Sequence, residues 1–126
     1  MKAEARGREF ALKFLAPWNA HDTASVLASL PEDFVWQFTT GTHPNGTVYR
    51  GKDQLRVALE RLFETVPDIH YEIVDLHPGH NLLVMELLVT GTNRETGAIL
   101  NFQACDIVLF DGEQLREKRS YRKVVS

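Results

Sequence analysis

The chain has 126 residues, of which 44% are hydrophobic and 25% are charged, a composition typical of one folded domain. Its formal net charge of -3 gives no reason to expect nucleic acid as a partner. A single cysteine, Cys105, excludes an internal disulfide, and no apolar run approaches the roughly 20 residues that span a bilayer, so we expect one cytoplasmic domain over residues 1–126 without a membrane anchor.

The first third of the chain predicts two helices and a strand. Apolar residues at helical spacing from Phe10 to Trp18 indicate a first helix, whose end Pro17 disturbs. Asp22 stands at the N-cap position of a short second helix that Pro31 stops. The stretch FVWQFTT, residues 34–40, is rich in β-branched and aromatic residues and predicts a strand, and residues 41–51 then form a loop or hairpin tip.

The rest of the chain predicts one long helix followed by strands. Residues from about Asp53 to Val66 carry the clearest amphipathic stripe, and Pro67 ends it. Four strands with short breaks between them, suited to antiparallel hairpins, are predicted at residues 69–77, 81–93, 98–110 and 114–125. Helices followed by a run of strands indicate an α+β fold, with the helices packed on one face of a curved antiparallel sheet. A long helix lying across such a sheet leaves a hollow.

The strand at 98–110 places an acid on its apolar face. Asp106 alternates with Phe102, Ala104, Val108 and Phe110, so its side chain is predicted to point into the core. An ionised carboxylate there must be paired, hydrogen-bonded or shifted in pKa, because burying it unpaired costs many kcal/mol.

The register of the last strand decides which partner Asp106 meets. A two-residue turn at Asp111-Gly112 places Asp106 opposite Glu117, whereas a four-residue loop pairs apolar residues with each other and places Asp106 opposite Arg119. We prefer the second register, and in either one Leu115, Glu117, Arg119 and Tyr121 share the face of Asp106. Two interpretations follow: a structural pair, with Arg119 bound to the acid or Tyr121 capping it, or a protonation-active acid in a pocket.

Three stretches carry a family resemblance that spans nearly the whole chain. They are WNAHDTASVLASLPEDFVW, YRGKDQLRVALERLFETVPDIHYEIVDL and DIVLFDGEQLREKRSY. Together they resemble the NTF2-like superfamily, and within it the SnoaL-like polyketide cyclases and the ketosteroid-isomerase-like proteins. The resemblance implies a cystatin-like cone, in which a curved antiparallel sheet wraps around a long helix and further helices precede it.

The same resemblance implies roles for single residues. The position of Asp106 matches the general acid/base of the cyclases. In the isomerases the matching acid stays protonated and donates a hydrogen bond to an oxyanion. That isomerase acid is a standard example of a carboxyl group kept neutral by an apolar site. The isomerase base falls on Gln37 or Phe38, neither of which can accept a proton from carbon, and the isomerase tyrosine falls on Phe14. The cyclase histidine falls near Asn93. These departures argue against a steroid isomerase or a standard cyclase.

Other residues complete the predicted site. Tyr121 and Arg119 are expected to orient or tune Asp106 as further catalytic residues. The residues expected to contact substrate, either as aromatic walls or at the pocket mouth, are Phe14, Trp18, Trp36, Phe38, His43 and Phe63. The histidines show no convergent metal-binding spacing, and the basic residues of the last strand indicate a solvated face.

Two functions remain open from the sequence. The first is a small cofactor-independent enzyme that performs acid–base chemistry on a hydrophobic cyclic carbonyl compound through Asp106. The second is a non-catalytic module that binds a ligand or a protein. The resemblance also implies a homodimer formed through the outer face of the sheet.

Overall fold

The structure is a computed structural model that describes residues 3–125. Its elements, in chain order, are α1 (Ala3–Asn19), α2 (Thr23–Ala28), β1 (Val35–Gln37), β2 (Val48–Arg50), α3 (Gly51–Thr65), β3 (His70–Gly79), β4 (Leu82–Thr92), β5 (Ile99–Asp111) and β6 (Gln114–Arg122). The fold is α+β, as the sequence predicts. None of the helices in this part of the chain is long and apolar enough to cross a membrane.

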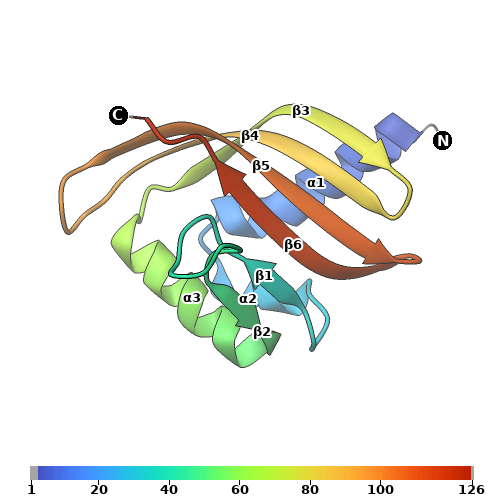
Figure 1. The fold of residues 1–126 in the computed structure, drawn as a ribbon, viewed down its shortest axis with the longest axis horizontal. Coiled ribbons are helices and arrows are strands. Elements are labelled where there is room, and N and C mark those ends of the chain that lie inside the picture. The colour runs from blue at the N-terminus through green and yellow to red at the C-terminus, as the bar shows by residue number, and fades with distance from the viewer. Residues whose placement is uncertain (1–2, 126) are drawn as a thin grey trace.

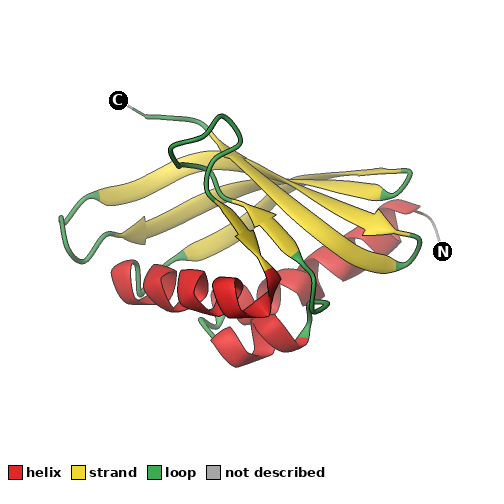
Figure 2. Ribbon diagram, turned by 60° about the horizontal axis from the view of Figure 1, so that its bottom comes forward, coloured by secondary structure: helices red, strands yellow, loops and turns green. Residues whose placement is uncertain are grey.

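All six strands form one sheet, with the order β2-β1-β6-β5-β4-β3. Neighbouring strands are antiparallel except β1 and β6, which pair in parallel. The sheet is long and curved (Figure 1), and the helices lie together on one of its faces (Figure 2). This is the curved sheet with packed helices that the sequence predicts, with one parallel pair that it does not.

Two local signals in the sequence are confirmed, the cap of α2 and the turn at Gly46. The side chain of Asp22 accepts a hydrogen bond from the backbone nitrogen of Ser25, 3.1 Å away, and so caps α2. Gly46 has φ of +75°, and a Cβ there would lie 2.2 Å from the carbonyl oxygen of Phe38, so this turn requires glycine. The predicted loop at 41–51 is wrong at its end, where Val48–Arg50 forms the strand β2 and pairs with β1.

The register of β6 contains an irregularity that reverses a prediction. Phe110 pairs with Leu115, as preferred from the sequence, but the next pair is Leu109 with Glu117. Arg116 is therefore an extra residue, a β-bulge, and beyond it the two faces of β6 are exchanged. Asp106 lies opposite Ser120, and the prediction that Glu117, Arg119 and Tyr121 share its face is wrong.

The core lies between the sheet and the helices. Trp18 of α1, Leu59 of α3 and Met85 of β4 are each fully buried there. Asn19, at the end of α1, ties the helix to the edge strand β3: its amide donates to the carbonyl oxygen of Tyr71 over 3.0 Å, and its side-chain oxygen accepts from the Tyr71 nitrogen over 2.8 Å. This clamp holds the rings of Trp18 and Tyr71 against each other, with centroids 6.2 Å apart.

Candidate functional site

A buried ion pair lies on the inner face of the sheet. Asp106 is 4% exposed and Lys118 is 2% exposed, and the Lys118 Nζ lies 3.5 Å from the Asp106 Oδ2. Asp106 points inward because it alternates with the apolar residues of β5, and Lys118 points inward because the bulge at Arg116 shifts β6 by one residue. The two residues are diagonal neighbours across the β5–β6 ladder, a separation that a long lysine side chain can span.

Aromatic rings surround the ammonium of Lys118. Its Nζ lies 3.7 Å from the centroid of a Trp18 ring and 4.6 Å from that of Trp36, with Phe14 at 5.9 Å. Trp36 is adjacent because it pairs directly with Lys118 in the parallel β1–β6 ladder. Its indole nitrogen donates a hydrogen bond to the Ser120 hydroxyl, 3.0 Å away, which fixes the ring beside the pair. Cation–π attraction therefore supplements a single carboxylate in balancing this buried charge.

Burial alters the proton affinity of the groups around this pair. Burial lowers the pKa of Lys118, and the negative charge of Asp106 opposes that shift without cancelling it. The pKa of Tyr71 is raised well above its usual range, first by burial and then by the charge of Asp106. Tyr71 is thus a neutral phenol at physiological pH, and the Lys118 ammonium is a stronger acid than an ordinary lysine.

A small cavity opens onto the pair. Its volume is about 80 Å³, and Asp106, Lys118, Tyr71 and Arg122 are among its lining residues in an otherwise mostly apolar wall. A second hollow of about 280 Å³, which we call the outer hollow, shares Trp36, Phe38, Leu62 and Leu100 with this inner cavity. It continues along α3. One water needs roughly 10–15 Å³ of such a cavity, so the inner cavity has room for several waters or for a small functional group. The remaining part of a larger ligand must lie in the outer hollow.

The structure brings together some of the residues that the sequence predicts for substrate contact. Trp36 and Phe38 line both the inner cavity and the outer hollow. Phe14 and Trp18 do not line the cavity; they lie behind Lys118, with their rings facing its ammonium. Contact with substrate remains a prediction for Trp36 and Phe38, whereas Phe14 and Trp18 can act only through Lys118.

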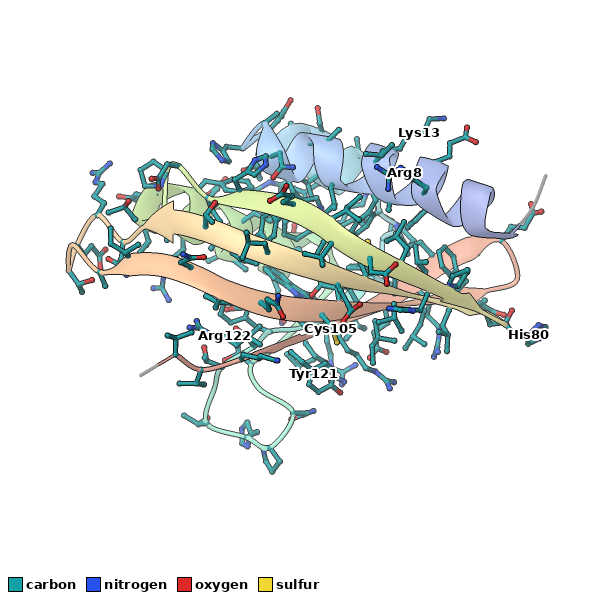
Figure 3. All side chains as sticks on the ribbon, turned by 90° about the horizontal axis from the view of Figure 1, so that it is seen from above. Arg8, Lys13, His80, Cys105, Tyr121 and Arg122 are labelled. Carbon is teal, nitrogen blue, oxygen red and sulfur yellow. The ribbon has the colours of Figure 1, made fainter. Side chains whose placement is uncertain are left out.

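Other predicted site residues lie elsewhere. His43 is exposed on the loop before β2, and Phe63 packs against His21 with ring centroids 5.3 Å apart; neither lines the cavity. Arg119 binds Glu117, with Nε 2.6 Å from its carboxylate oxygen. Tyr121 is 52% exposed and lies, with Cys105, on the face of the sheet away from α1 (Figure 3). Because the bulge exchanges the faces of β6, Arg119 and Tyr121 cannot touch Asp106.

Four residues at the site were missed or given no role by the sequence: Tyr71, Lys118, Ser120 and Arg122. Lys118, Ser120 and Arg122 follow from one cause, the bulge in β6, which no turn residue announces. Tyr71 could have been found, because it alternates with the apolar residues Ile69 and Ile73 at the start of β3.

The outer face of the sheet carries a polar cluster that the histidine spacing does not predict. Ligand-type atoms of Asp75, His77 and Glu86 lie within 4.8 Å of one another, and all three side chains are exposed. The His77 Nε2 is 2.8 Å from a Glu86 carboxylate oxygen and 3.7 Å from one of Asp75. The hydrogen bond to Glu86 raises the pKa of His77. The contacts that define this cluster are ion pairs, and we assign no metal to it.

Comparison with known proteins identifies the fold and the family. The SnoaL-like domain family matches residues 11–118. No curated protein matches the chain. Solved structures match it closely in shape, including an NTF2-like protein from Burkholderia xenovorans LB400, with 20% identity, a TM-score of 0.76, and 95% of this chain and 91% of that chain covered.

Two further structures extend the likeness. A SnoaL-like protein from Burkholderia thailandensis E264 has 18% identity and a TM-score of 0.75, with 98% of this chain and 100% of that chain covered. A protein with a ketosteroid-isomerase-like fold from Catenulispora acidiphila, solved in complex with trimethylamine, has 14% identity and a TM-score of 0.76, with 90% and 84% covered. At these identities the likeness establishes the cystatin-like, NTF2-like fold.

Proposed function

This chain belongs to the SnoaL-like domain family, and from that premise we propose that it is a small cofactor-independent enzyme acting on a hydrophobic cyclic carbonyl compound by acid–base chemistry. The observation that carries the proposal is the buried Asp106–Lys118 pair lining a mostly apolar cavity. Acids and bases held beside a pocket in such surroundings are typical of catalytic sites. The lone cysteine, Cys105, supports a cytoplasmic place for this chemistry.

The proposed reaction is proton transfer at a carbon next to the carbonyl group. The Asp106 carboxylate accepts the α-proton, and the electron pair of the broken C–H bond moves to the carbonyl oxygen, giving an enolate. The Lys118 ammonium donates a hydrogen bond or its proton to that oxygen, which its lowered pKa favours. Return of the proton from Asp106 to the same or another carbon, with any proton on the oxygen going back to Lys118, completes an isomerisation. In a cyclisation the enolate carbon instead attacks a second carbonyl carbon of the same molecule, and the oxygen of that carbonyl group takes the proton held by Asp106.

The sizes of the inner cavity and the outer hollow support placing a different part of the substrate in each. The inner cavity of about 80 Å³ accommodates the reacting carbonyl group and its neighbouring carbons, and the hollow of about 280 Å³ beyond Trp36 and Phe38 accommodates the rest of the molecule. Trp36 and Phe38 are the residues we propose to contact substrate at the junction.

Hydrogen–deuterium exchange tests the proposal without a known substrate. A panel of small cyclic ketones and 1,3-diketones is incubated with the protein in D₂O, and loss of the α-proton signal is followed by NMR. We expect exchange above the buffer rate with the wild type and a loss of about 100-fold or more in Asp106→Asn. Asp33→Asn, which changes an exposed acid before β1, is the matched control and should exchange normally. Equal exchange in the two variants would refute the role of Asp106.

One observation favours a second function, a non-catalytic binding module. Asp106 is already paired with Lys118, and the inner cavity lies well below the roughly 300–1,000 Å³ of most small-molecule pockets. In that case ketones from the panel would bind, seen as shifts of the Trp18 and Trp36 indole signals, and no wild-type exchange above the buffer rate would occur.

A further inference from the structure

Arg122, the last residue of β6, brings an uncompensated positive charge to the cavity. It lies opposite Ala104 in the β5–β6 ladder, two residues along the strand from Ser120, and therefore faces inward. Its guanidinium carbon lies 3.7 Å from the centroid of the Phe102 ring, a cation–π contact that holds the group against the ring. Its Nε is buried and has no hydrogen-bond partner among the described residues.

The charges of the cavity wall do not balance. Asp106 and Lys118 neutralise each other, and Tyr71 is neutral because its pKa is raised. None of the ion pairs formed within residues 3–125 includes Arg122. A buried donor on a charged group needs a partner, and an empty one marks a place where a ligand or water supplies it. The cavity thus carries one positive charge more than it needs for its own stability.

We propose that Arg122 anchors an anionic group of the ligand, so that the molecule bound beside Asp106 is a carbonyl compound that also carries a carboxylate. The assignment deepens the proposed function and rests on it for the carbonyl group alone. Ser120, opposite Asp106, lies between Lys118 and Arg122 on the inner face of β6. The carbonyl oxygen of the ligand can therefore meet Lys118 at one end while its carboxylate meets Arg122 at the other.

The small side chain of Ala104 supports this arrangement. It lies directly across from Arg122, and its methyl group takes up little of the cavity, which both residues line. A guanidinium held against an aromatic ring keeps its N–H groups at one place in the cavity wall, and a guanidinium can bind a carboxylate through two parallel hydrogen bonds. The partial exposure of Arg122 near the end of β6 (Figure 3) gives such an anion a route from solvent.

A matched pair of probes tests the anchor. The affinity of the wild type for 4-oxopentanoate is compared with that for its neutral amide, 4-oxopentanamide, by isothermal titration calorimetry. We expect the acid to bind about tenfold to hundredfold more tightly, the range of a hydrogen bond to a charged group. In Arg122→Met, whose side chain still covers Phe102, this preference should vanish. It should persist in Arg116→Met, which changes an exposed arginine of the same strand.

The outcomes separate this proposal from the proposed function. Equal wild-type affinity for acid and amide, no binding of either probe, or a preference that survives in Arg122→Met overturns the anchor. Each of these results is independent of the ketone exchange assay, because neutral ketones carry no carboxylate. Exchange that depends on Asp106, without a preference for the acid, therefore supports the proposed enzyme and refutes the Arg122 anchor. A preference for the acid that depends on Arg122, without exchange, supports the anchor and refutes the enzyme. If Arg122→Met does not fold, Arg122→Gln takes its place, because it keeps hydrogen-bond donors and removes the charge, and the preference should vanish there too.

Discussion

Lys118 is a charged residue in a place where the chain could have used an apolar one. Its ammonium has one carboxylate, that of Asp106, at 3.5 Å and aromatic rings on its other sides. Buried pairs of this kind contribute little net stability over a well-packed apolar pair, yet removing one partner leaves the other buried and uncompensated. This asymmetry makes the pair testable by unfolding experiments alone.

We predict that Lys118→Met destabilises the protein by about 3–5 kcal/mol, because it leaves the Asp106 carboxylate buried without a partner. The double variant Asp106→Asn/Lys118→Met should recover most of that loss, since both charges are then gone. The measurement is the free energy of unfolding in urea for the wild type, both single variants and the double variant. If the double variant is no more stable than Lys118→Met, the two residues do not form the pair described here.

His77 gives a prediction at a titratable surface residue. Its hydrogen bond to Glu86 raises its pKa above the ordinary 6.5. The bond therefore stabilises the fold at pH values below 6.5, and the stabilisation is lost as the pH rises through the raised native pKa. NMR titration of the His77 ring should give a pKa above 6.5 in the wild type and a lower one in Glu86→Gln.

The control for this titration is thermodynamic. The wild type should exceed Glu86→Gln in its urea midpoint at about pH 5.5 by more than at about pH 8.5, because the charged ring binds the Glu86 carboxylate more strongly than the neutral ring does. Since His77 is half exposed, the difference should be small. A difference that grows with pH would contradict the assignment.

At the scale of the element, the bulge in β6 determines the chemistry of the site. It places Lys118, Ser120 and Arg122 inside and leaves Arg119 and Tyr121 outside. Period-2 patterning identified the inward face of β5, including Asp106, because apolar residues occupy that face on both sides of the acid. The same reasoning failed on β6, where charged residues occupy both faces and no glycine or proline signals the extra residue at Arg116.

Deleting single residues from β6 tests this account. Deletion of Arg116 removes the bulge, yet Leu115 remains paired with Phe110 and Glu117 with Leu109, so Lys118 stays inside. We expect that variant to fold. Deletion of Arg119 instead turns Ser120 and Arg122 to the opposite face and should be strongly destabilising. The urea midpoints and far-ultraviolet circular dichroism of both variants provide the measurement, and equal damage from the two deletions would show that the register is set elsewhere.

Other elements show how far patterning reaches. The apolar spacing of α1 and α3 predicted both helices, and the short breaks between β3, β4, β5 and β6 predicted their hairpins. The parallel pairing of β1 with β6 was not predictable, because it joins strands about 80 residues apart and depends on the whole sheet being formed. That pairing positions Trp36 beside Lys118. The aromatic surroundings of the ammonium therefore could not be predicted from the sequence either.

At the scale of the whole molecule, the two faces of the sheet differ in their cover. The helices pack against one face, and no helix of residues 3–125 covers the other (Figures 1 and 2); we call it the bare face. On the bare face, Val74 is 54% exposed and Tyr121 is 52% exposed, and both border a hollow of about 220 Å³ that Cys105 also lines. Exposed apolar side chains grouped around a hollow mark a surface suited to a protein partner.

We propose that a second copy of this chain covers the bare face, giving a homodimer. Tyr121→Glu introduces a charge beside the hollow of this surface and should shift the protein to monomer in sedimentation velocity experiments, whereas we expect the wild type to sediment as a dimer. Val57→Glu, which changes a residue of α3 that is 64% exposed on the helical side, is the matched control and should remain dimeric. A monomeric wild type, or an unchanged dimer in Tyr121→Glu, would rule out this interface. Because Tyr121 does not line the cavity, Asp106-dependent exchange should survive in the monomer.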